Sequence, residues 1–96
     1  RSMMSGALDL LKFDLQRSGV ELGDEAYLMS LLQAAEQSLT RQGIQPCGDY
    51  DYIQTVVGTA AWMYRKRING ESEPAYLRRL RLDLLSSQKM RGDAYA

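Results

Sequence analysis

The segment 51–68 constrains the fold most, because its helical periodicity places small or apolar side chains on two sides of one helix. One side carries, at intervals of three and four residues, Ile53, Val57, Ala60, Tyr64 and Ile68. The second side carries Gly58, Trp62, Thr55 and Thr59. A domain of 96 residues has one small core, which covers one side of such a helix. We therefore expect the second side to contact another protein subunit, as in a component of an assembly.

Apolar residues recur with helical periodicity in the rest of the chain as well. This pattern predicts an all-α fold, a small bundle of about four helices. The expected helices cover about 7–17, 25–42, 51–68 and 74–85. Asp24 is placed to cap the second helix, and Asp51 with Gln54 has capping-box spacing at the start of the third. Gly43 and Gly70 follow the second and third helices, where glycine commonly ends a helix.

Apolar stripes on the other three helices define the expected core. They consist of Leu8, Leu11 and Leu15, then Leu28, Leu31, Leu32, Ala35 and Leu39, and finally Leu77, Leu80 and Leu84. The helical domain is expected to span residues 5–85. Residues 86–96 have no usable apolar periodicity, and we expect a flexible C-terminal tail that orders on binding. Residues 1–4 are interpreted as a cloning remnant followed by the start of the chain.

Composition argues against several classes of function. The 12 basic and 12 acidic residues balance, so the net charge gives no bulk attraction to nucleic acid or membranes. The chain has no histidine, the usual general base, and Cys47 is its single cysteine. The sequence contains no nucleophile–base pair, phosphate-binding loop, metal-ligand spacing or apolar run near the ~20 residues that cross a bilayer. We expect no catalytic site, no cofactor, no metal and no membrane contact; the chain is interpreted as not an enzyme.

Apolar residues off the core stripe recur on three helices. In any single helix, irregular core packing explains such residues equally well. The same pattern in three helices favours an oligomer over that explanation. The candidate subunit interface comprises Leu10, Phe13, Gly58, Trp62, Leu82 and Leu85.

Basic residues concentrate near the turn between the third and fourth helices. The cluster comprises Arg65, Lys66, Arg67, Arg78, Arg79 and Arg81, and the tail adds Lys89 and Arg91. Cations at a helix C-terminus interact favourably with the helix dipole, and a solvated face explains the rest, so these charges also have a purely structural explanation. Their closeness along a helical hairpin predicts contact with acidic protein surfaces or with passing DNA.

The same hairpin has a second interpretation, a small helix-turn-helix-like regulator that binds DNA through the fourth helix. Glu71 and Glu73 lie where such a helix would approach phosphates, and the net charge is zero. Both features disfavour sequence-specific DNA binding, which stays the alternative to an assembly module.

Four segments, taken in order, resemble one known family. They are the opening helix Leu8-Asp9-Leu10-Leu11-Lys12-Phe13-Asp14-Leu15, the segment Leu31-Leu32-Gln33-Ala34-Ala35-Glu36, the stretch Ala60-Ala61-Trp62-Met63-Tyr64-Arg65-Lys66-Arg67 and the ending Leu84-Leu85-Ser86-Ser87-Gln88-Lys89. Together, over about 5–90, they resemble the small helical head-tail connector proteins of long-tailed double-stranded DNA bacteriophages and prophages.

The resemblance implies a non-enzymatic adaptor for head completion in virion assembly. Such a subunit forms a homo-oligomeric ring, docks on the portal protein after DNA packaging and extends the DNA channel toward the tail. Its implied partners are copies of itself, the portal and a tail-side connector or tail completion protein, with non-specific contact to packaged double-stranded DNA. Its implied location is the head–tail junction of the virion, after assembly in the bacterial host cytoplasm.

Overall fold

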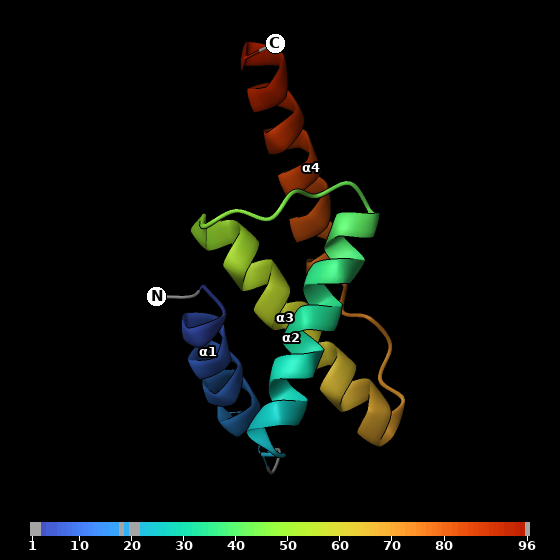
Figure 1. Ribbon diagram of the computed structural model, residues 1–96. Helices are drawn as coiled ribbons and strands as arrows, with labels where there is room; N and C mark the ends of the chain where they lie inside the picture. Colours follow the sequence, from blue (N-terminus) through green and yellow to red (C-terminus); the bar gives the residue numbers. More distant parts are fainter. Residues whose placement is uncertain (1–2, 18, 20–21, 96) are drawn as a thin grey trace.

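The computed structural model describes the backbone of residues 3–17, 19 and 22–95, and the side chains of residues 6–17, 19 and 22–90. Within these residues the chain forms four helices and no strand, which confirms the predicted all-α bundle (Figure 1). The helices are α1 (Met3–Arg17), α2 (Glu25–Arg41), α3 (Tyr50–Asn69) and α4 (Ala75–Tyr95).

Local capping explains most helix boundaries. The Asp24 carboxylate accepts a hydrogen bond from the Ala26 N–H at 3.3 Å, as predicted for the start of α2. Gly70 adopts the left-handed conformation (φ 72°) and donates its N–H to the Lys66 carbonyl, which ends α3 as predicted. The predicted start of α3 is wrong by one residue, because the helix begins at Tyr50 and Asp49 occupies its N-cap position.

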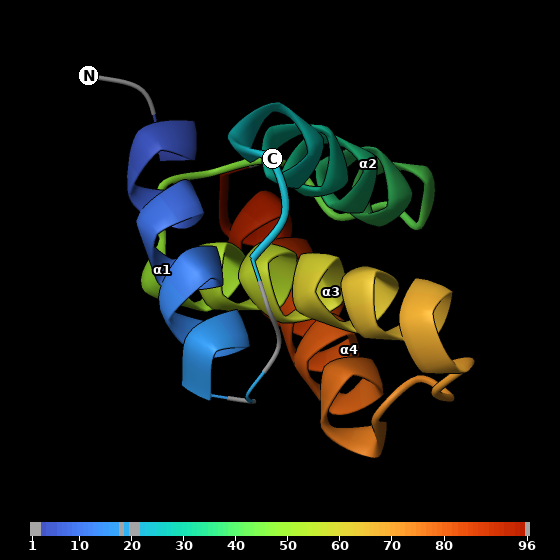
Figure 2. The ribbon, with the colours of Figure 1, turned by 90° about the horizontal axis from the view of Figure 1, so that it is seen from below.

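Helix α3 is the centre of the bundle and contacts each of the other three helices (Figure 2). Helices α1 and α2 also contact each other, and an ion pair between Lys12 and Glu25 joins them. The core confirms most of the leucine stripes; its fully buried side chains include Leu11, Leu15, Leu28, Leu32, Leu39, Tyr52 and Leu77. Ile68, which was assigned to the inner side of α3, is instead exposed on its last turn.

The second side of α3 is covered by α4 of the same chain. A Cβ atom built on Gly58 would lie 2.8 Å from Leu77 Cδ2 and 3.2 Å from the Tyr76 hydroxyl. Thr55 and Thr59 are buried as well. Gly58 therefore packs against the fourth helix of its own chain, which returns after Gly70, and a contact of Gly58 with a neighbouring subunit stays a prediction. One small core accommodates both sides of α3.

Helix α4 is longer than expected. Its helical backbone continues past Leu85 to Tyr95, and its C-terminal part projects beyond the other helices (Figure 1). The residues after Leu85 lack an apolar stripe, but Gln88, Lys89 and Met90 favour helix, and extending an existing helix needs no new nucleus. The expected tail boundary is thus not the end of the helix. Mobility of residues 86–96 in solution stays a prediction.

Candidate functional site

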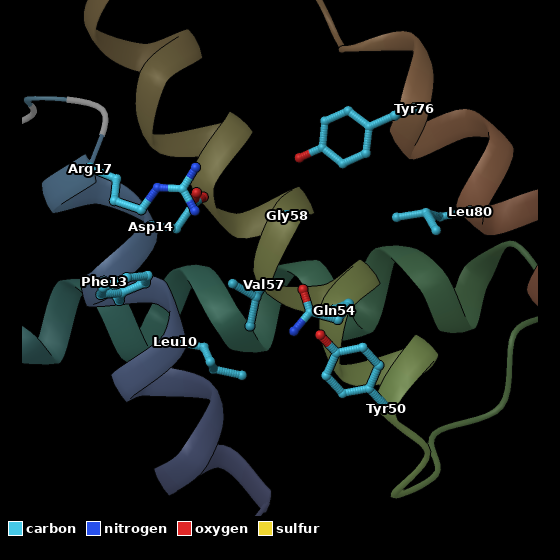
Figure 3. A pocket seen from close by; sticks show the side chains of 10 residues that line it. All are labelled: Leu10, Phe13, Asp14, Arg17, Tyr50, Gln54, Val57, Gly58, Tyr76 and Leu80. Carbon is cyan, nitrogen blue, oxygen red and sulfur yellow. The ribbon is translucent and has the colours of Figure 1, made fainter.

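A groove of about 310 Å³ lies between α1 and α4, with α3 as its floor (Figure 3). It is lined by Leu10, Phe13, Asp14 and Arg17 of α1, Tyr50, Gln54, Val57 and Gly58 of α3, and Tyr76 and Leu80 of α4. The walls come from opposite ends of the chain, so the groove exists only once all three helices have packed.

Large apolar side chains are exposed around this groove. Leu10, Phe13, Tyr50 and Tyr76 are 39% to 72% exposed, and all four line it. Single exposed apolar residues are common on protein surfaces, whereas a contiguous group marks a site of contact with another molecule. The groove is therefore the strongest candidate for a binding surface in the described part of the chain.

Gly58 sets the depth of the groove. Because Gly58 has no side chain, α4 approaches α3 closely at this point, and the Tyr76 hydroxyl points toward the glycine (Figure 3). Any larger residue would both raise the floor and press against Leu77, which is fully buried. The small residue that the sequence placed at a subunit interface thus shapes a surface groove from beneath.

The charged side chains that line the groove are one acid and one base, Asp14 and Arg17. Burial is the main cause that raises the pKa of Tyr76, and the Asp14 carboxylate across the groove raises it further, whereas Arg65 lowers it. Arg17 places its guanidinium 5.9 Å from the centre of the Phe13 ring. Other exposed carboxylates stand on the three groove helices or at their ends, namely Asp9, Asp49, Asp51 and Asp83.

The structure divides the predicted interface residues among three places. Leu10 and Phe13 line the groove. Leu82 is exposed, but it lies about 200° around the α4 axis from Leu80 and faces away from the groove. Leu85 is half-buried against the core. The predicted set is therefore not one continuous surface.

Trp62 is engaged within its own chain. Its indole N–H donates to the Glu71 carbonyl at 2.9 Å, and the Lys66 ammonium lies 5.1 Å from the ring centre. The indole thereby fastens the loop between α3 and α4 to the last turns of α3. The half-buried remainder of the ring is free to contact a partner, but a subunit contact through Trp62 stays a prediction.

The basic cluster is partly neutralised within the chain. Arg65 Nε lies 3.1 and 3.2 Å from the two carboxylate oxygens of Glu71, and Arg81 forms an ion pair with Glu73. Arg67 donates to the Tyr27 hydroxyl at 3.3 Å. Five other basic residues of this cluster and the tail are exposed and form no ion pair with a described residue, namely Lys66, Arg67, Arg78, Arg79 and Lys89. The side chain of Arg91 lies outside the described residues.

Tyr50 and Tyr76 are the exposed aromatic residues of the groove that sequence reasoning missed. Each lies at the first or second position of its helix, where an apolar stripe is hardest to recognise. An aromatic residue near a helix start was the one signal that the sequence offered, and a helix cap explained the region around Tyr50 equally well.

No group of His, Cys, Asp or Glu within the described residues is arranged to hold a metal ion. Across the same residues, the helices are too short or too polar to span a membrane. Comparison of the chain with protein-family models, with curated proteins and with solved structures finds no match.

Proposed function

We propose that this chain is a head-tail connector subunit of a double-stranded DNA phage or prophage. It forms a homo-oligomeric ring that docks on the portal, extends the DNA channel and binds a tail-side completion protein. The observation that carries the proposal is the groove, where Leu10, Phe13, Tyr50 and Tyr76 leave apolar surface uncovered on a small helical domain. The sequence resemblance supplies the kind of assembly.

Two separate surfaces support an adaptor over a simple dimer. The groove lies along the body of the bundle, whereas the end of α4 projects away from it (Figure 1). A ring subunit between portal and tail needs contacts with its neighbours and with at least one further protein. The groove and the end of α4 are two distinct surfaces on one small domain, and together they would provide these contacts.

The remaining cations fit a non-specific role at a DNA channel. Glu71 and Glu73 neutralise Arg65 and Arg81, so positive charge is left on scattered residues of α3 and α4. Such charges bind phosphates without reading bases, as a channel that passes every sequence requires. A regulator would instead present several side chains of one helix to base edges.

The decisive experiment is electron microscopy of the purified chain with and without its cognate portal protein. We expect rings stacked coaxially on the portal. A parallel selection on random DNA duplexes should converge on no sequence. Failure to bind the portal would overturn the proposal. Recovery of one operator, bound at about 10⁻⁸ M or tighter at physiological salt, would overturn it in favour of a regulator.

A further inference from the structure

The last turns of α3 carry two bases beside apolar surface, at the end of the bundle opposite to the projecting part of α4 (Figure 1). We propose that this surface docks an acidic segment of a partner protein, in which carboxylates stand next to apolar side chains. The proposal goes beyond the connector function and does not depend on it.

The surface consists of two shallow hollows that share Arg67. One, of about 450 Å³, is lined by Trp62, Met63 and Lys66 in addition to Arg67. The other, of about 490 Å³, extends from Arg67 to Ile68 and to Tyr27 of α2. The surface therefore combines bases with aromatic and aliphatic side chains over the last two turns of α3.

Aromatic rings hold both bases in place. The Lys66 ammonium lies 5.1 Å from the centre of the Trp62 ring. The Arg67 guanidinium lies 5.4 Å from the centre of the Tyr27 ring, and Arg67 also donates to the Tyr27 hydroxyl at 3.3 Å. Tyr27 in turn packs against Tyr64, with the ring centres 5.9 Å apart. Because the bases are already ordered, binding an anion costs them little side-chain entropy.

The charge of this surface is positive. Among the described residues, the hollow beside Trp62 is lined by two bases and no acid. Lys66 and Arg67 form no ion pair with a described residue. The described acids that lie near this surface along the chain or through a contact have partners of their own: Glu71 pairs with Arg65, Glu25 pairs with Lys12, and Asp24 accepts from the Ala26 N–H. Glu21 lies outside the described residues. A partner that carries negative charge is therefore complementary to this surface.

The apolar side chains favour a protein as the partner. Ile68 is 64% exposed, and Trp62 and Met63 are half-buried. The dipole of α3 explains why bases stand at its C-terminus, but it does not explain why apolar side chains are left in water beside them. Protein interfaces are enriched in aromatic residues, Met and Arg, which is the composition found here.

A nucleic acid would use this surface less completely. Its phosphates would contact the two bases and leave Ile68 and Met63 without partners. Stacking of bases from a single strand needs open ring faces, whereas Lys66 and Arg67 already lie over the rings of Trp62 and Tyr27. An acidic segment with apolar side chains matches both components of the surface.

Titration with a model peptide tests the surface, and Trp62, the single tryptophan of the chain, reports its occupancy. The probe is the blocked peptide Glu-Leu-Glu-Glu-Leu-Glu. One control peptide has Gln in place of Glu, and the other has Ser in place of Leu. We expect the probe to change the emission of Trp62 and to bind about fivefold more tightly than either control, with a smaller advantage over the Gln peptide at high salt. Amide chemical shifts should place the probe at the last turns of α3.

Matched variants separate the two bases from the total charge of the chain. Lys66→Gln with Arg67→Gln should weaken binding of the probe about fivefold. Arg78→Gln with Arg79→Gln removes two exposed bases of α4 that line neither hollow, so binding should change by less than about twofold. Ile68→Gln should weaken binding of the probe but not of the Ser peptide. Circular dichroism checks the fold, and Ile68→Gln alters only an exposed side chain, so it tests the surface even where the double variant unfolds.

Three results would overturn the proposal. The first is emission of Trp62 that stays unchanged up to about 1 mM probe, and the second is an equal loss of binding in the two double variants. The third is a short DNA duplex that binds more tightly than the probe and loses its affinity in Lys66→Gln with Arg67→Gln, which would assign the surface to nucleic acid instead.

Discussion

Helices α3 and α4 are almost equal in length, 20 and 21 residues, yet they are buried very differently. Seven consecutive residues of α3 are buried, from Thr55 to Ala61, whereas α4 buries only Leu77 and Leu84 among its described side chains. Small residues such as Gly58 and Ala61 let the other three helices pack closely against α3. The leucine and arginine pattern of α4 provides one narrow stripe, which holds its first half and leaves the second half outside the body.

The contrast separates a helix at the centre of the bundle from a helix that packs along only part of its length. Helix α3 contacts the other three helices, and four of its residues line the floor of the groove. Helix α4 packs against the bundle through its first half, and its C-terminal part projects (Figure 1). Its exposed residues include Leu82, Lys89 and Met90. One short sequence thus forms both a groove and a protruding helix end.

The largest effect should distinguish two leucines of α4 that lie only two positions apart. Leu84→Ala removes a buried side chain and leaves a cavity, and we expect the free energy of unfolding to fall by about 3 kcal/mol. Leu82→Ala should change it by about 0.5 kcal/mol or less, since Leu82 is exposed. Urea denaturation at a concentration where the chain is monomeric measures both. Equal losses would show that both sides of α4 are packed in the monomer.

A second test addresses the close approach of α3 and α4. Gly58→Val should destabilise the monomer by about 2 to 3 kcal/mol, because the new side chain presses on the buried Leu77. Gly6 offers a matched control, since a Cβ there meets nothing within 4 Å. Gly6→Ala should therefore stabilise by about 0.5 to 1 kcal/mol, whereas Gly58→Ala should not show this gain. A Gly58→Val variant of unchanged monomer stability but lower oligomer mass would support the subunit-interface interpretation of this glycine.

These two helices also show what sequence reasoning can predict. Helix type, the cap at Asp24, the stop at Gly70 and most core leucines follow from local spacing, because neighbours three or four apart determine them. The partner of the second side of α3 depends on where the chain returns after the loop, which periodicity does not encode. The groove needs residues from three helices, so the aromatic residues at the helix starts, Tyr50 and Tyr76, could not be assigned to one site before the helices were placed. The sequence analysis did not predict the part of α4 after Leu85, because its residues have helix propensity but no apolar stripe.

A third test probes the opposite side of α3, where Tyr52 is fully buried and donates to a Glu36 carboxylate oxygen at 3.3 Å. Burial, followed by the Glu36 charge and this hydrogen bond, raises the pKa of Tyr52 to about 12. In the unfolded chain the hydroxyl ionises near its ordinary value of 10. Between pH 10 and 12 only the unfolded state loses this proton, so stability falls as pH rises.

Tyr52→Phe removes that titration and keeps the ring. The variant should therefore lose less stability than wild type on going from pH 9 to pH 12, by on the order of 2 kcal/mol. Chemical denaturation at a series of pH values gives the difference between the two proteins, which cancels the titration of residues common to both. Parallel curves for the two proteins would mean that Tyr52 ionises as easily in the folded state as in the unfolded chain.

The smallest effect concerns the point where α4 leaves the body. Gln88 Oε1 accepts from the Gln45 N–H at 2.8 Å, and Gln88 Nε2 donates to the Gln45 carbonyl at 2.9 Å. Both residues lie at the surface, so Gln88→Ala should cost about 1 kcal/mol or less. Hydrogen exchange gives a sharper measurement than stability, because the Gln45 amide should exchange faster in Gln88→Ala. Gln88→Glu is the matched variant: its carboxylate still accepts from the Gln45 N–H but cannot donate to the carbonyl, so Gln45 should stay protected. Unchanged exchange at Gln45 in Gln88→Ala would show that this clamp does not hold the α2–α3 loop, and that packing around Leu84 and Leu85 alone fixes the point from which α4 projects.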